Sequence, residues 1–138
     1  MKFSLKNKWV LITGASSGFG AAAALAFAAH GARLLLGARR LDRLDAVADK
    51  AKKSGASQAL YHKLDVSKTD SVETFLTWVK GKLKGQALHV LVNNAGGAQG
   101  MDHVADAKDA DWETMMQTNV LGVLRIVCDP KNSSVDSR

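Results

Sequence analysis

Short apolar runs alternate with amphipathic segments along the 138 residues of the chain. The apolar runs predict four strands, at Lys8–Thr13, Arg33–Leu36, Ala59–Leu64 and Leu88–Val92. Segments with apolar residues at helical spacing predict four helices, at Phe19–His30, Leu41–Lys53, Thr69–Leu83 and Trp112–Val127. Each predicted strand is therefore followed by a predicted helix.

This alternation predicts the fold class. Strands that alternate with helices over short loops form a parallel sheet covered by helices on both faces. Strands buried on both faces are apolar throughout, as WVLI, LLL and VLV are here. We expect a doubly wound, Rossmann-type α/β fold that stops after the helix following the fourth strand. Residues 1–128 are expected to form one domain, and residues 129–138, in which Pro130 ends the helix, a polar, disordered tail.

Composition and charge narrow the classes of protein. The net charge is +6, and residues 1–64 carry 11 basic and 3 acidic side chains, so this half attracts a phosphorylated cofactor or presents a solvated surface. The basic residues match no nucleic-acid-binding module, the four histidines share no metal-ligand spacing, and no apolar run reaches membrane-spanning length. The single cysteine, Cys128, fits a reducing compartment. We expect a cytoplasmic protein without a metal, a nucleic-acid partner or a membrane anchor.

The stretch TGASSGFG lies at the first predicted strand-to-helix turn. In this architecture that turn binds nucleotides, because the helix N-terminus presents free N–H groups and a partial positive charge. The first glycine permits the tight turn, the second lets the backbone approach a pyrophosphate, and the third lets the helix pack on the sheet. The alternative is a flexible turn without a ligand. The residues expected at the cofactor are Gly14, Ser16, Ser17, Gly18, Phe19 and Gly20.

The end of the second predicted strand, LLLGARR, indicates which dinucleotide binds. Folds that prefer NAD place an acidic side chain here on the ribose 2′-hydroxyl, but this position is Ala38 and the next acid is Asp42. Arg39 and Arg40 follow Ala38, and a guanidinium pairs bidentately with a phosphate. NADP is therefore the expected cofactor; the alternative is a solvated arginine pair at the start of a helix.

Several motifs together resemble the short-chain dehydrogenase/reductase family. TGASSGFG has the family's TGxxxGxG spacing, NNAG is the end of its fourth strand, LDV resembles its segment at the adenine ring, and QTNVLG contains the asparagine of its catalytic tetrad. The stretches GARRLDRL and NNAGGAQGMDHVADAKDADWETMMQTN resemble the NADP-dependent 3-hydroxy acid (serine-type) dehydrogenases in particular. The resemblance implies cofactor contacts at Asp65, Val66, Asn93, Ala95 and Gly96, and a catalytic role for Asn119.

The rest of the family's active site is missing from this sequence. The family uses a serine, and a tyrosine followed four residues later by a lysine, whose charge lowers the pKa of the tyrosine. Tyr61, the one tyrosine, is followed four residues later by Asp65, and we expect it to be a packing residue. The resemblance implies that this chain is the NADP-binding part of an oxidoreductase that acts on 3-hydroxy acids, alcohols or carbonyls. It also implies that the chain by itself is inactive. The alternative is a non-catalytic protein that docks with a full-length relative.

Three further expectations follow from the family pattern. In the family strand order 3-2-1-4-5, the fourth strand, Leu88–Val92, becomes an apolar sheet edge when no fifth strand follows. The last helix contributes to the family's dimer interface, so Met115, Met116 and Val123 face either the core or a partner, and a core position is favoured for Val123. Many NADP-using relatives carry a basic residue where this chain has Ser17, which leaves the 2′-phosphate to the two arginines.

Overall fold

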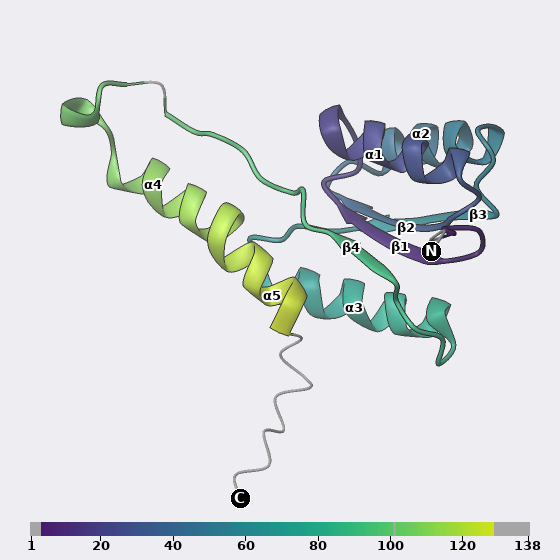
Figure 1. The fold of residues 1–138 in the computed structure, drawn as a ribbon. Helices are drawn as coiled ribbons and strands as arrows, with labels where there is room; N and C mark the ends of the chain where they lie inside the picture. Colours follow the sequence, from purple (N-terminus) through teal and green to yellow (C-terminus); the bar gives the residue numbers. More distant parts are fainter. Residues whose placement is uncertain (1–3, 101, 129–138) are drawn as a thin grey trace, which may run out of the picture.

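The computed structural model describes residues 4–100 and 102–128, which form one parallel sheet with helices on both faces (Figure 1). The four strands are β1 (Trp9–Thr13), β2 (Arg33–Ala38), β3 (Gln58–Lys63) and β4 (Val90–Val92). They run in the order β3-β2-β1-β4, and every pairing is parallel. The expected doubly wound α/β fold is therefore confirmed. The predicted tail, residues 129–138, lies outside the described residues.

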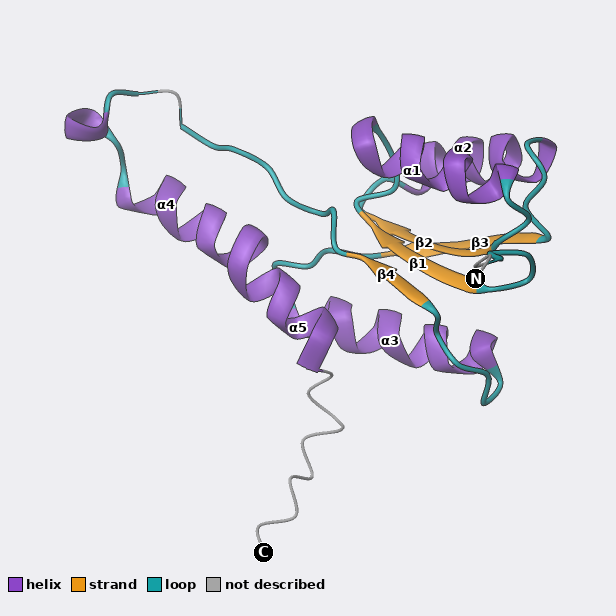
Figure 2. Cartoon of the chain, in the orientation of Figure 1, coloured by secondary structure: helices purple, strands orange, loops and turns teal. Residues whose placement is uncertain are grey.

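Helices cover the two faces of the sheet in pairs. Helices α1 (Gly18–Ala29) and α2 (Leu41–Lys53) lie on one face, and α3 (Thr69–Leu83) and α5 (Gly122–Cys128) lie on the other (Figure 2). Alternate residues of β1 enter the two cores: Val10 and Ile12 pack on the α1–α2 side, and Leu11 packs with Phe75 on the α3 side. Because β1 and β2 are buried on both faces, their apolar runs are unbroken.

The fourth strand is shorter than its apolar run predicted. Leu88 and His89 precede the ladder, which pairs Val10 with Val90 and ends at Val92. Nδ1 of the His89 ring accepts the Trp9 N–H at 3.2 Å, while the backbone N–H of His89 donates to the Trp9 carbonyl at 3.0 Å. The regular ladder starts at Val90, two residues after the predicted start at Leu88.

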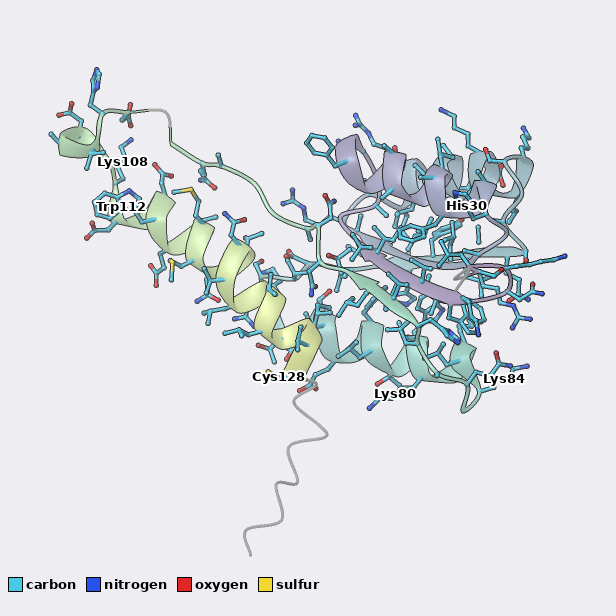
Figure 3. All side chains as sticks on the ribbon, viewed as in Figure 1. His30, Lys80, Lys84, Lys108, Trp112 and Cys128 are labelled. Atoms are coloured by element: carbon cyan, nitrogen blue, oxygen red, sulfur yellow. The ribbon has the colours of Figure 1, made fainter. Side chains whose placement is uncertain are left out.

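The last predicted helix consists of three consecutive parts. It begins at α4 (Asp109–Met115), continues as the π-helical turn η2 (Met116–Leu121) and ends as α5. Two aspartates, Asp109 and Asp111, lie in the first turn, where negative charge is favoured by the helix dipole, and the helix starts three residues before the predicted boundary. Trp112 and Lys108 lie at the end farthest from the sheet (Figure 3).

Apolar surface is exposed on β4 and on the long helix that α4, η2 and α5 form together. In the described part of the chain β4 is an edge strand, as expected, and Leu91 is 36% exposed whereas its neighbour Leu11 is buried. The long helix also carries an exposed apolar stripe, made of residues four apart: Trp112, Met116, Val120 and Leu124. Val123 and Met115 are half-buried, so Val123 is less buried than a core position would be. No helix among residues 4–100 and 102–128 combines the length and apolar character needed to cross a bilayer.

Candidate functional site

A cavity of about 480 Å³ lies at the carboxyl edge of the sheet, where β1, β2, β3 and β4 end. In a doubly wound sheet this edge is where ligands bind. Ten of the residues predicted from the sequence line the cavity: Gly14, Ser16, Ser17, Phe19, Arg39, Arg40, Asp65, Val66, Ala95 and Gly96. The structure thus brings together side chains from four separate loops.

Four predicted residues are not part of the cavity lining. Gly18 opens α1 with a φ of +55°, and a Cβ built there would meet nothing within 4 Å. Gly20 is buried under the turn, and Asn93 is exposed beside the lining residues. Asn119 reaches the cavity only through the backbone of Gly97.

The glycine turn is held in place by the segment that follows β4. Gly14 has a φ of +65°, a left-handed conformation that favours glycine. The Asn94 side-chain amide donates to the carbonyl of Thr13 at 3.2 Å and to that of Gly14 at 3.1 Å. A Cβ on Gly14 would lie 2.8 Å from Cα of Ala95, and one on Gly20 would lie 2.5 Å from Nδ2 of Asn94. The turn therefore tolerates only hydrogen at both positions.

Sequence reasoning missed two residues that build this turn, Thr13 and Asn94. The hydroxyl of Thr13 accepts the backbone N–H groups of Asn94 at 3.1 Å and Ala95 at 3.0 Å. Among the described residues, Thr13 is a polar side chain buried in the core, at 1% exposure. Both residues belong to motifs that were noticed, TGASSGFG and NNAG, but only the fold shows that these motifs bond to one another.

The N-terminus of α1 lacks both a capping side chain and an acidic residue. Ser17 is its extended N-cap residue and makes no side-chain capping bond, and the first turn contains no acidic residue. The first N–H groups of a helix have no partner inside the helix and carry partial positive charge. Nη2 of Arg40 donates to Oγ of Ser17 at 3.3 Å, so a cationic side chain lies beside the same turn. This arrangement suits a pyrophosphate next to a further phosphate.

Asp65 is an ionised acceptor on the cavity wall. Burial raises the pKa of its carboxyl, but hydrogen bonds from the Ser67 hydroxyl at 2.6 Å and backbone N–H at 3.0 Å, with the charges of Arg39 and Lys68, outweigh it and lower the pKa below 3.8. A carboxylate accepts hydrogen bonds and donates none at neutral pH. It is therefore suited to an amino group of a ligand.

Asn119, the residue that the resemblance assigns to catalysis, lies in η2. Its Oδ1 accepts the Gly97 N–H at 2.9 Å, and its Nδ2 donates to the Gly97 carbonyl at 2.8 Å. A Cβ on Gly96 would lie 2.8 Å from the same Oδ1. Single π-helical turns occur frequently at functional sites, and this one fixes the backbone that lines the cavity.

Tyr61 lies away from the cavity and has a structural environment. Its ring packs against the core between the sheet and α1–α2, and its hydroxyl donates to Oδ1 of Asp45 at 2.8 Å. That hydrogen bond, with minor contributions from burial and from the charges of Asp45 and Asp49, raises the pKa of the phenol above 10.0. A base needs the opposite shift. The expectation of a packing residue agrees with this environment. The described residues contain no group of side chains that could hold a metal ion.

Comparison with known proteins gives the family. The family model of the short chain dehydrogenases matches residues 8–129. The chain belongs to this family. The resemblance inferred from the glycine turn, NNAG and the asparagine of η2 is thereby confirmed.

Short-chain dehydrogenases similar to this chain use both nicotinamide cofactors. The NADP-dependent 3-hydroxy acid dehydrogenase of Salmonella typhimurium is 35% identical over 115 residues, which cover 83% of this chain and 44% of that protein. An alcohol dehydrogenase of Thermococcus sibiricus complexed with 5-hydroxy-NADP has a TM-score of 0.81 and 37% identity, covering 89% of this chain and 51% of its own. An NADH-dependent reductase complexed with NAD has a TM-score of 0.80 and 28% identity, covering 90% of this chain and 50% of its own. The chain spans about half the length of the curated relatives it matches.

The close packing behind the glycine turn predicts opposite effects of the same substitution at two helical glycines. Gly20→Ala places a methyl against the Gly14 carbonyl and Asn94, and we expect it to lower the free energy of unfolding by about 1–3 kcal/mol. Gly81→Ala in α3, where a Cβ meets nothing within 4 Å, should raise it by about 0.5–1 kcal/mol, because alanine is the better helix former. Urea unfolding measures both. Equal changes at the two positions would contradict the packing described.

Proposed function

We propose that this chain is the NADP-binding part of a short-chain oxidoreductase. The observation that supports NADP most directly is the pair Arg39 and Arg40 on the cavity wall at the end of β2, directly after Ala38. The alcohol dehydrogenase in complex with 5-hydroxy-NADP and the NADP-dependent 3-hydroxy acid dehydrogenase support the same choice. Because a similar reductase binds NAD, the proposed preference for NADP over NAD rests on the side chains of Arg39 and Arg40.

The proposed binding mode follows the order of the lining residues. The first turn of α1, with Ser16, Ser17 and Phe19, holds the pyrophosphate, since free N–H groups point there. The two guanidinium groups hold the 2′-phosphate. Asp65 and Val66 contact the adenine, and the segment from Asn93 to Gly96 lies along the ribose on the nicotinamide side. When bound, NADP supplies or accepts the hydride; the protein's own residues bind and orient it.

The proposed reaction class is the oxidation of 3-hydroxy acids or alcohols, or the reduction of the matching carbonyls, in the cytoplasm. The name of the Salmonella relative supports the substrate class, and the single cysteine supports the compartment. Of the family's catalytic groups these 138 residues contain Asn119, whose amide does not titrate near neutral pH. We therefore include in the proposal that this chain binds the cofactor without transferring hydride.

Removing both guanidinium groups should weaken NADPH far more than NADH. For Arg39→Ala/Arg40→Ala we expect roughly a 10- to 100-fold loss of NADPH affinity, which corresponds to about 1–3 kcal/mol for a charge-assisted pair. NADH lacks the 2′-phosphate, so its affinity should change by less than about threefold. Nucleotide fluorescence measures both titrations.

Arg43→Ala is the matched control, because Arg43 is exposed on α2 and does not line the cavity. It should leave the NADPH affinity of the protein within about twofold. Tighter binding of NADH than of NADPH by the unaltered chain, or an unchanged preference in the double variant, would refute the assignment of NADP.

The purified 138-residue chain should show no hydride transfer with serine, other 3-hydroxy acids or their oxo products. General acid–base participation supplies about 10²–10⁴-fold, and substrate orientation adds to it. Absorbance of the reduced nicotinamide is followed beside Asn119→Ala, and both traces should be flat. Turnover that disappears in the variant would mean that another residue of this chain transfers the proton.

A second candidate function is non-catalytic pairing with another short-chain dehydrogenase or with a second copy. The observation that favours it is the exposed stripe of the long helix, where Met116, Val120 and Leu124 are 53%, 43% and 50% exposed. Apolar surface of this kind at regular helical spacing is typical of a contact between helices.

The test is size-exclusion chromatography of the chain alone and mixed with a full-length relative. We expect a self- or mixed oligomer that is lost in Met116→Glu/Leu124→Glu, since charges in a desolvated helix contact are unfavourable. Thr74→Glu, on an exposed position of α3, is the control. Separate monomer peaks for the unaltered chain would count against pairing.

A further inference from the structure

Arg125 in α5 joins three separate segments through one guanidinium group. Its Nε donates to Oγ1 of Thr69, the first residue of α3, at 3.2 Å. Its Nη1 donates to the carbonyl of Val66 at 3.1 Å and to that of Gln117 at 3.0 Å. Its Nη2 donates to Oε1 of Gln117 at 2.6 Å. The side chain is half-buried, so these hydrogen bonds are stronger than the same contacts in open solvent.

The contact with Gln117 is made inside the irregular turn η2. Gln117 lies within this π-helical segment, whose backbone hydrogen bonds run from residue i to residue i+5. Arg125, eight residues later, donates to the Gln117 carbonyl and binds the side chain of the same residue. The guanidinium therefore stabilises the turn in its π-helical form.

The segments that Arg125 holds form two walls of the cavity. On one wall, η2 carries Asn119, whose amide is bonded in both directions to the backbone of Gly97. On the other, Val66 lines the cavity and packs against Gly122, where an added Cβ would lie 2.9 Å from Cγ2 of Val66. Arg125 itself is not among the lining residues. It bonds to residues of both walls from outside the cavity.

We propose that Arg125 is a positioning residue for the nucleotide: it holds the η2 turn against the Val66 loop and so fixes Asn119 on Gly97 at the edge of the cavity. The proposal rests on the proposed function, because NADP is taken as the ligand of this cavity. Loss of the guanidinium removes its bonds to the Gln117 carbonyl and side chain and lets η2 return to a regular helix, which rotates Asn119 relative to Gly97.

The variant that tests this is Arg125→Met, which keeps the length of the side chain and removes its donors. Without nucleotide, hydrogen exchange at the Gly97 amide should accelerate by about tenfold or more, as it should in Asn119→Ala, because both changes release the same bond. NADPH affinity should fall by about tenfold. The amides of Leu11 and Leu35 in the central strands should keep their protection, which separates a local effect from loss of the fold.

The double variant Arg125→Met/Asn119→Ala measures the coupling. We expect it to bind NADPH about as weakly as the weaker single variant, because residues that act along one path are not additive. Lys82→Met, which removes an exposed cation from α3, should change neither readout. Unchanged Gly97 exchange in Arg125→Met, or effects of the two substitutions on affinity that multiply, would overturn the proposal.

Two further outcomes also test whether Arg125 positions Asn119. If Arg125→Met loses cooperative unfolding, Gln117→Ala, which removes the acceptor Oε1 with the rest of the amide but keeps the Gln117 carbonyl, must accelerate Gly97 exchange by a smaller factor, and no acceleration would overturn the proposal. If the unaltered chain binds no NADPH, the proposed function fails by itself. Gly97 exchange in the single and double variants then still decides whether Arg125 positions Asn119.

Discussion

The candidate site depends on one network of hydrogen bonds between the end of β1 and the end of β4. The Thr13 hydroxyl accepts two backbone N–H groups from the segment after β4, and Asn94 donates back to two carbonyls of the glycine turn. Each of these groups is partly or fully buried, where an unpaired polar group is costly. Because the bonds are reciprocal, the glycine turn after β1 and the cavity-lining segment after β4 are held together.

Close packing of glycines against the backbone reinforces this hydrogen-bond network. Gly14 and Gly20 lie where any Cβ would meet backbone or the Asn94 amide, so hydrogen is the side chain that the geometry requires. The same pattern recurs at the long helix, where Gly96 fits under Asn119 and Gly122 fits against Val66. Close backbone approaches thus hold the segments that line the cavity, and the charged residues of its lining are Arg39, Arg40 and Asp65.

Apolar surface remains exposed on the side of the sheet beyond β1. Leu91 on the edge strand and the stripe on the long helix are exposed in a chain that spans about half the length of its relatives. Open edge strands and apolar helix faces favour association. The elements that line the cavity therefore also carry exposed apolar surface.

The sequence by itself determined the order of strands and helices, the glycine turn at the first strand-to-helix junction and the arginine pair after β2. These features are local: apolar periodicity, turn chemistry and charge at a fixed distance along the chain carry them, and the parallel sheet follows from the alternation. The boundaries near β4 and η2 were less predictable, because the regular ladder of β4 begins only at Val90 and a π turn interrupts the last predicted helix.

Only the tertiary structure decided which of the noticed motifs touch. Thr13 and Asn94 are 81 residues apart, and Arg125 meets Val66 across 59. The apolar periodicity of the sequence does not reveal such pairs, because the periodicity is the same whether or not two distant side chains are in contact. The arrangement of Asn119 on Gly97, the π turn and the arginine behind it therefore came from packing two distant segments at one edge of the sheet, where buried polar groups must find partners.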